Sequence, residues 1–258
     1  MIDLHCHVLP GVDDGPPGLD DSLDLARVAA AEGTRKLVAT PHVNYRYPTT
    51  AATMRDAVER LNGALREADI PVEVAPGAEI AHDALPGLDD GELQALTLGG
   101  GPYLLLEAPL SAVGGDFEDA VTELQGREFG VVLAHPERCP SFHRDTERLA
   151  RLVRRGALCS VTSSAFTGRF GKPVRQLAEQ LLAGGLVHDV ASDAHDANHR
   201  PPLLRSNLVA SERQLPGLVD HIAWLTETAP AAILSGEPLP AAPPLPARRR
   251  TRRFSWSR

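Results

Sequence analysis

IDLHCH, at residues 2–7, is a short apolar run that ends in two histidines, and the interpretation of the whole chain follows from it. Alternate residues of a strand point to the same face, so His5 and His7 lie on one face. Six of the seven short apolar runs end in this way, in a histidine or a carboxylate. The runs lie near residues 2–5, 36–40, 72–76, 103–107, 130–134, 157–162 and 187–192. Buried strands have little other reason to end repeatedly in metal-binding side chains, so we predict that the strand ends converge on one metal site.

The spacing of the apolar runs predicts an α/β fold. Starts of successive runs lie about 25–35 residues apart, as strand–helix–strand units require, and amphipathic helical patterns separate them. One such pattern is LDDSLDLARVAAAEG, in which Gly33 ends the helix. Nearly continuous apolar strands are typical of a parallel sheet covered by helices. Ligands after almost every strand favour a closed barrel over an open doubly wound sheet. We therefore predict a distorted, TIM-like (β/α)7 barrel with the metal site at the C-terminal ends of the strands.

Length and composition predict one globular domain with a short tail. The chain has 258 residues, of which 43% are hydrophobic and 23% charged. We assign residues 1–237 to the domain and the Pro- and Arg-rich residues 238–258 to a flexible tail. No apolar stretch reaches the roughly 18 residues of a membrane span, and the N-terminus has no signal-peptide pattern, so a cytoplasmic protein is expected.

The charge distribution argues against a nucleic-acid duplex as the main ligand. The last eleven residues contain six arginines and no acid, so the other 247 residues carry a formal charge of −14 against −8 for the whole chain. A strongly negative body repels a phosphate backbone. The three cysteines form no CxxC motif, which excludes the usual thiolate zinc spacing.

The sequence also excludes two familiar phosphate-handling classes. No cysteine has an arginine six positions later, as a cysteine phosphatase needs, because Cys6, Cys139 and Cys159 are followed at that offset by Val, Asp and Ala. Neither G-x-G-x-x-G nor G-x-x-x-x-G-K-[ST] occurs. Phosphatase chemistry in this chain would therefore depend on metal. A lone HxH is more often a pair of satisfied polar residues, but Glu79, Asp193 and His195 follow other strands and favour a metal site.

DLHCHVLPGVDDG, ATPH, GAEI, LLLE, LAHPER and ASDAH occur in this order along the chain. Together they resemble the polymerase-and-histidinol-phosphatase (PHP) superfamily, and within it the bacterial manganese-dependent protein-tyrosine phosphatases of capsule and exopolysaccharide synthesis. The resemblance runs from residue 2 to about 240. It implies three divalent ions, with manganese favoured over iron or zinc. His5, His7, Glu79 and Asp193 would hold the first, Glu79 with Glu107 and His135 the second, and Asp14, His42 and His195 the third.

The resemblance also implies a role for two arginines and for the substrate. Arg138 and Arg200 would clamp the phosphate, for which a guanidinium is well shaped. Asp13 is second to Asp14 as a ligand and is expected instead to cap the turn at Gly15. The implied substrate is phosphotyrosine in a protein, such as a bacterial tyrosine kinase, attacked by a metal-activated water. A homo-oligomer is also suggested.

Two other functions remain open at this point. A small phosphate ester, such as histidinol phosphate or a nucleotide, would use the same site, because the loops that would decide the substrate are the least readable part of the sequence. A non-enzymatic module with purely structural metals would need fully closed coordination, and nine ligands shared among three ions leave positions for water.

Overall fold

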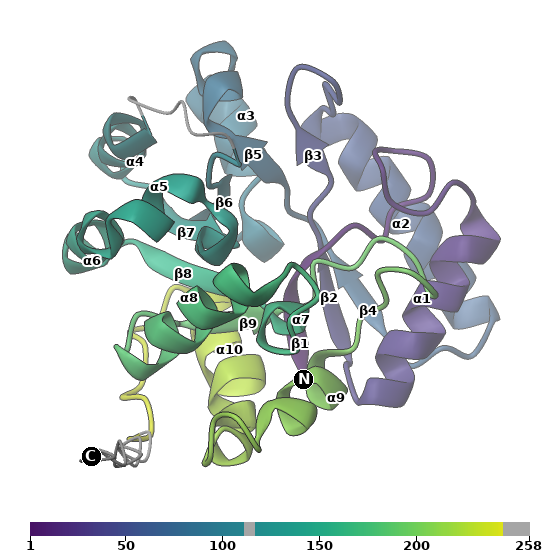
Figure 1. Cartoon of the computed structure of the whole chain (residues 1–258). Helices are drawn as coiled ribbons and strands as arrows, with labels where there is room; N and C mark the ends of the chain where they lie inside the picture. Colours follow the sequence, from purple (N-terminus) through teal and green to yellow (C-terminus); the bar gives the residue numbers. More distant parts are fainter. Residues whose placement is uncertain (111–116, 245–258) are drawn as a thin grey trace, which may run out of the picture.

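The computed structural model describes residues 1–110 and 117–244, and within them the strands are all parallel to their sheet neighbours (Figure 1). They form a three-stranded sheet of order β1-β2-β4 and a six-stranded sheet of order β3-β5-β6-β7-β8-β9. The strands are β1 Ile2–Cys6, β2 Lys36–Ala39, β3 His42–Val43, β4 Glu73–Ala75, β5 Glu79–Ala81, β6 Tyr103–Glu107, β7 Gly130–Ala134, β8 Leu158–Thr162 and β9 Asp189–Ala191. The predicted parallel α/β class is confirmed.

Helices alternate with the strands along the chain and cover the outside of the sheets (Figure 1). The α-helices are α1 Leu19–Glu32, α2 Ala51–Glu67, α3 Asp90–Ala95, α4 Phe117–Gly126, α5 Pro140–Arg144, α6 Thr146–Arg154, α7 Ser163–Phe166, α8 Lys172–Ala183, α9 Leu204–Ser211 and α10 Ala229–Ser235. Shorter elements are the 3-10 helices η1 His82–Gly87, η2 Leu98–Gly100, η3 Pro136–Arg138 and η4 Val219–His221, and the π-helix η5 Trp224–Thr228. Helix α1 ends as predicted, at Gly33, whose φ of 94° suits a residue without a side chain.

Two prolines lie where predicted apolar runs end, and each separates that run from a short second strand. Pro41 lies between β2 and β3, and Pro76 between β4 and β5. A proline has no N–H to donate to a sheet, so each run changes from one sheet to the other at its proline. A close approach helps to fix the second break, because a Cβ on Gly77 would lie 2.8 Å from Val38 Cγ1. The chain therefore passes directly from the three-stranded sheet to the six-stranded sheet at both prolines.

The sheets also approach each other at the ends of β1 and β9. His5 O accepts a hydrogen bond from Asp193 N at 2.8 Å, and His7 N donates to Ala194 O at 2.9 Å. Cys6 and Ala194 form an isolated parallel bridge. These contacts place the histidines of β1 beside the segment that follows β9.

Both faces of the strands are buried, which explains their nearly continuous apolar sequences. Leu104 and Leu106 of β6 belong to a large apolar cluster that includes residues of the surrounding helices. Leu105, between them, belongs to a smaller cluster with Leu4, Val38 and other strand residues, together with Ile233 of α10. Successive side chains of a strand alternate between its faces, so one cluster lies under the helices and the other between the strands.

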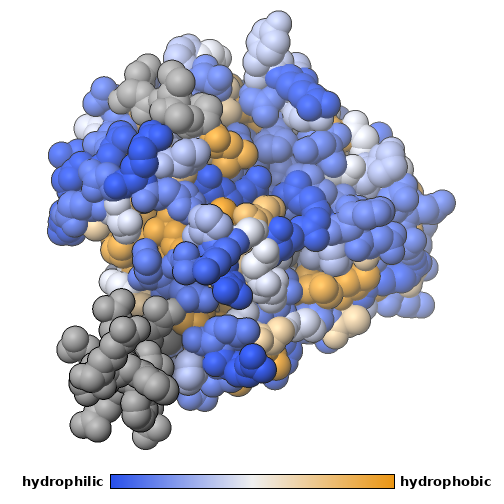
Figure 2. Space-filling model, viewed as in Figure 1, coloured by the Kyte–Doolittle hydropathy of each residue, from blue (hydrophilic) through white to orange (hydrophobic). Residues whose placement is uncertain are grey.

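The surface in view is mostly hydrophilic, with apolar residues in separate small patches (Figure 2). In the part of the chain that the structure describes, no helix has the length and hydropathy needed to span a membrane. Part of the predicted tail contacts the fold: Trp224 Nε1 donates to Pro240 O, and Leu239 packs on the apolar core. Residues 245–258, which include the arginines, lie outside the described residues.

Candidate metal centre

All nine side chains predicted as metal ligands come together at the C-terminal ends of the strands. They fall into four overlapping groups, and within each group the potential ligand atoms lie within 4.8 Å of one another. The groups are His7, Asp14, His42 and His195; His5, His7 and Asp193; His5, Glu79 and His135; and His42, Glu79 and Glu107. Because parallel strands end at a common edge, residues up to 190 positions apart in sequence meet there.

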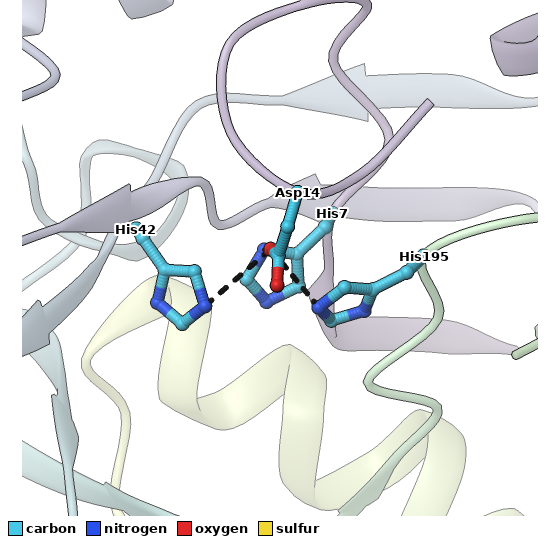
Figure 3. Close-up of side chains that lie close together, drawn as sticks. All are labelled: His7, Asp14, His42 and His195. Carbon is cyan, nitrogen blue, oxygen red and sulfur yellow. Dashed lines mark ion pairs between the residues drawn. The ribbon is translucent and has the colours of Figure 1, made fainter. Parts of the chain in front are cut away.

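Asp14 lies between two imidazoles contributed by distant parts of the chain (Figure 3). Its Oδ1 atom is 3.6 Å from His42 Nε2, in β3, and 3.3 Å from His195 Nε2, in the segment after β9. His7 Nδ1 is farther away, at 3.9 Å. The Asp14 side chain is 42% exposed, so this group lies at the mouth of the site. A hydrogen bond from the His195 side chain, followed by the influence of His195, His42 and His7 nearby, lowers the pKa of Asp14 below its usual range.

Glu79 occupies the centre of the cluster. Its Oε2 atom is 3.3 Å from Nε2 of both His5 and His7 and 3.2 Å from His42 Nδ1, while Oε1 is 2.7 Å from His135 Nε2. Burial alone raises the pKa of Glu79, but His5 and His135 lower it well below its usual value. A fully buried carboxylate among four imidazoles can therefore remain ionised.

The two carboxylate oxygens of Asp193 face different groups, one the histidines and the other two arginines. Oδ1 lies 3.6 Å from His5 Nε2 and 3.7 Å from His7 Nε2. Oδ2 accepts hydrogen bonds from Arg138 Nη1 at 2.8 Å and from Arg200 Nη2 at 2.7 Å. The two arginines predicted to bind phosphate therefore lie beside the ligand cluster. Arg138 is also held from behind, because its Cζ lies 4.7 Å from the centre of the Phe170 ring.

Left-handed backbone at two strand ends helps to aim these side chains. His135 has φ of 35° and Asp193 has φ of 51°. Non-glycine residues rarely adopt this region, and such strain tends to occur at functional sites. Both residues follow a strand directly or closely, so the turn reorients the side chain toward the cluster.

Asp13 has a larger role than the sequence revealed. Its Oδ1 accepts from Gly15 N at 2.9 Å, so the predicted turn cap is present. Its Oδ2 lies 2.6 Å from His7 Nδ1 and also accepts from His42 N at 2.9 Å. Burial lowers the pKa of His7, but the hydrogen bonds to Asp13 and Glu79 outweigh it and raise this pKa to about 10. Asp13 thus orients the imidazole of His7 and the backbone of His42. The DDG motif alone does not show which of its two aspartates has this role.

The donor set fits divalent cations. Glu79 Oε2, His42 Nδ1 and His135 Nδ1 are buried atoms without a hydrogen-bond partner among the described residues. Ligand atoms about 2.0–2.2 Å from one ion lie roughly 3–4 Å from each other, which is the spacing measured around Glu79 and Asp14. Imidazole and carboxylate donors without thiolate suit manganese, iron or zinc. Burial, followed by the charge of Glu79, raises the pKa of Glu107 to about 7, and a cation beside it would favour its ionised form.

One cavity borders the cluster, and another lies beside the loop that follows His42. The larger, of about 780 Å³, lies between the loop after β3 and the η1–α3 segment, and its lining includes Val43, Tyr45 and Asp83. Tyr47, in the same loop, stacks on His42 with ring centroids 5.8 Å apart and an interplanar angle of 10°. The smaller, of about 110 Å³, has Asp193 and Arg200 in its lining. The smaller cavity thus reaches the cluster at Asp193, while the larger one comes next to it in sequence at Val43, the residue after His42.

Comparisons with known proteins agree with this arrangement. Residues 1–224 match the family described as capsular polysaccharide synthesis, CpsB/CapC. The tyrosine-protein phosphatase YwqE of Bacillus subtilis is 36% identical over 251 residues, which cover 97% of this chain and 98% of YwqE. The putative tyrosine-protein phosphatase CapC of Staphylococcus aureus is 29% identical over 225 residues, covering 86% of this chain and 87% of CapC.

A solved structure is also similar. It comes from work on YwqE of Bacillus subtilis and CpsB of Streptococcus pneumoniae, described there as unique metal-dependent tyrosine phosphatases. The two chains superpose with a TM-score of 0.81 and 33% sequence identity, over 96% of this chain and 100% of the other.

Proposed function

The chain belongs to the CpsB/CapC family of capsular polysaccharide synthesis, and from that premise we propose that it is a metal-dependent protein-tyrosine phosphatase. The observation that carries the proposal is the meeting of nine imidazole and carboxylate ligands beside two guanidinium groups. Metal ligands and phosphate-binding groups in one site are the components that phosphomonoester hydrolysis needs.

We infer that three divalent ions, manganese first, bind in this centre. His5, His7, Glu79 and Asp193 would hold one, Glu79 would bridge to another held by Glu107 and His135, and Asp14, His42 and His195 would hold the third. Such ions polarise phosphoryl oxygens and lower the pKa of water to about 7. The four carboxylates would leave about +2 on a centre of three divalent ions, which complements a phosphate dianion.

The side chains of the protein itself position the substrate and the ligands. Arg138 and Arg200 are fixed by a shared acceptor, Asp193 Oδ2, so their remaining N–H groups are held beside the cluster for phosphoryl oxygens. Asp13 holds His7 and the backbone of His42 in place. No side-chain nucleophile is required, and Cys6, Cys139 and Cys159 are all buried.

The rim supports a protein substrate over a small phosphate ester. The cavity of about 780 Å³, which is lined by Val43 and the loop that follows it, is large enough for several residues of a polypeptide. Tyr45 lies at its edge and is 99% exposed. We propose phosphotyrosine in a bacterial tyrosine kinase of polysaccharide synthesis as the substrate, in accord with the family to which the chain belongs.

We further infer that seven strand units form a distorted (β/α)7 barrel within residues 1–237, as in the PHP superfamily. The hydrogen bonds between the ends of β1 and β9 and the apolar cluster between the strands support this arrangement. Residues 238–258 would form the tail. The cytoplasmic location and the homo-oligomer stay predictions.

The test is hydrolysis by the full chain loaded with manganese. We expect release of phosphate from a phosphotyrosine peptide and from p-nitrophenyl phosphate, with much slower release from a phosphoserine peptide, histidinol phosphate and a nucleotide. Activity should disappear on chelation and return with Mn²⁺. Absence of turnover on every substrate with manganese, iron or zinc would overturn the proposal, and preference for a small metabolite would overturn the assignment of a protein substrate.

A further inference from the structure

A second polar cavity lies against the ligand cluster, on the side of α7 and α9. Its volume is about 110 Å³, and we define this lateral cavity by five of its lining residues: Ser164, Thr167, Arg169, Arg200 and Asn207. It also touches Asp193, so it is continuous with the metal centre. The volume suits a carboxylate or a phosphate group and is too small for an aromatic residue with its backbone.

The charge of the lateral cavity is positive. Two guanidinium groups line it, and Asp193 is the one acid among the described residues of its wall. Asp193 is already neutralised, because its Oδ2 accepts from both Arg138 and Arg200 and its Oδ1 faces His5. The cavity therefore keeps an excess of positive charge that a bound anion would balance.

Arg169 brings to the lateral cavity a positive charge that has no role in the proposed phosphatase site. Its side chain is exposed and forms no hydrogen bond or ion pair with the residues 1–110 and 117–244. The turn around it is well defined: Arg169 N donates to Ser164 O at 3.2 Å, and Gly168 and Gly171 take φ of 87° and 92°. The next residue, Phe170, lies under the Arg138 guanidinium. The turn therefore places Arg169 near Arg138 and Arg200 and leaves its guanidinium N–H groups available to a ligand.

Neutral polar groups complete the wall. Thr167 Oγ1 donates to Ser164 O at 3.0 Å, and Asn207 Nδ2 donates to Ser163 Oγ at 3.1 Å, which fixes both side chains. Ser164 is also part of the lining. A pair of guanidiniums with hydroxyl and amide groups is the usual composition of an anion site.

We propose that the lateral cavity is a subsite for a second anionic group of the substrate polypeptide, with Arg169 as its specificity-determining residue. The inference rests on the tyrosine-phosphatase function proposed above. Because the lateral cavity has Asp193 and Arg200 in its lining, the anionic group would come from a residue close to the phosphotyrosine in the peptide sequence. A glutamate carboxylate and a second phosphotyrosine share the required chemistry.

The experiment compares peptides that differ only in the neighbouring charge. One series carries glutamate, phosphotyrosine or alanine at single positions up to three residues on either side of the phosphotyrosine. We expect the best-placed glutamate to raise kcat/KM about fivefold over alanine, as one exposed ion pair allows, and a second phosphate to raise it further. In Arg169→Gln this preference should vanish, while p-nitrophenyl phosphate and the alanine peptide are hydrolysed as by the wild type. Arg169→Lys should keep part of the preference, since it keeps the charge but not the fork.

A binding measurement separates this proposal from the proposed function. Peptides with a non-hydrolysable phosphonodifluoromethyl group in place of the ester should show the same fivefold preference in Kd for the wild type and none for Arg169→Gln. Arg213→Gln, an exposed arginine outside the cavity, should behave as the wild type. Equal losses on all substrates would show that Arg169 serves the scissile phosphate, and would overturn the subsite. A phosphatase without any preference for an acidic neighbour would overturn the subsite alone, whereas absence of both turnover and phosphopeptide binding would overturn both proposals.

Discussion

Arg200 donates through Nη2 to Asp193 Oδ2 at 2.7 Å, while Oδ1 of the same carboxylate lies 3.6 Å from His5 Nε2. One carboxylate thus joins an arginine that we propose to bind phosphate to the ligand cluster. Arg138 shares Oδ2 at 2.8 Å, so both guanidiniums take their positions from a residue that itself faces the cluster. The site is organised before substrate arrives, which lowers the free-energy cost of orienting the phosphate.

Replacing Arg200 tests this organisation. We expect Arg200→Gln to lower kcat/KM for a phosphotyrosine peptide by about 10²-fold, as for loss of one charge-stabilising donor in other enzymes. Arg200→Lys should lose somewhat less, because it keeps the charge without the paired donors. Steady-state kinetics measure the loss, and elemental analysis should find the wild-type metal content in both variants. A fall in metal content in proportion to activity would show that Arg200 acts through the ligands instead.

The central position of Glu79 predicts an unequal dependence of metal binding on two carboxylates. Glu79 takes part in two of the ligand groups and Glu107 in one. We therefore expect Glu79→Gln to lose more bound metal than Glu107→Gln, by elemental analysis after gel filtration. Glu79→Gln should also lose most of the rise in unfolding free energy that Mn²⁺ gives, which is about 2.7 kcal/mol for a ligand present at a hundred times its Kd. Equal metal loss in the two variants would contradict a bridging Glu79.

Asp13 is expected to affect metal affinity without being a ligand. Its Oδ2 lies 2.6 Å from His7 Nδ1, and a carboxylate on the far side of a ligating imidazole fixes the orientation of that ring and its basicity. We expect Asp13→Asn to weaken Mn²⁺ binding by about 10- to 100-fold, measured by calorimetric titration of the metal-free protein. The control is Asp20→Asn, an exposed acid in the first turn of α1, which should bind Mn²⁺ as the wild type does. Unchanged affinity in Asp13→Asn would leave Asp13 as a turn cap only.

The sequence predicts the meeting of the nine side chains because parallel strands have a simple geometry. His5 and His7 lie two residues apart on β1, so they share a face whatever the surrounding packing. His135 directly follows β7, and Glu107 ends β6, at the same edge of the sheet. Strand ends are thus predictable from local pattern, and the pattern is repeated often enough to identify a site.

The division into two sheets was missed, although the sequence contains the signal. Pro41 directly follows the run predicted near residues 36–40, and Pro76 ends the run predicted near 72–76; a proline interrupts the hydrogen bonding of a central strand. The packing of Gly77 against Val38 depends on the arrangement of neighbouring strands, which no local pattern records.

The different roles of Asp13 and Asp14 could not be worked out from local chemistry. Two adjacent aspartates offer the same carboxylate oxygens as ligands or hydrogen-bond acceptors. The conformation of the turn directs Asp13 toward His7 and Asp14 toward His42 and His195. The same holds for Arg169, whose importance depends on α7 and α9 enclosing the lateral cavity. Residues whose roles depend on loop packing are thus the ones that sequence reasoning leaves undecided.

Asp189 predicts a pH-dependent stability that is independent of catalysis. This residue of β9 is fully buried, and it accepts a hydrogen bond from Ser160 Oγ while its Oδ1 has no partner among the described residues. Burial, together with the nearby Asp3, raises the pKa of Asp189 to about 8 from 3.8. The folded protein therefore holds a proton that the unfolded chain releases above pH 4. The stability that the protonated Asp189 contributes to the fold is fully present below pH 3.8 and is lost as the pH rises to about 8.

Replacing Asp189 by Asn removes the titrating group and keeps an acceptor for Ser160. We expect the unfolding free energy of the wild type, relative to Asp189→Asn, to fall by up to about 1.4 kcal/mol per pH unit between pH 4 and 8 and to level off above it. Urea unfolding of both proteins in chelator at four pH values measures the difference. Asp220→Asn, at an exposed position on η4, should remain parallel to the wild type throughout this range. If the difference in unfolding free energy between the wild type and Asp189→Asn stays constant over this pH range, Asp189 is ionised in the folded protein. Its second oxygen would then be bound by groups other than the described side chains.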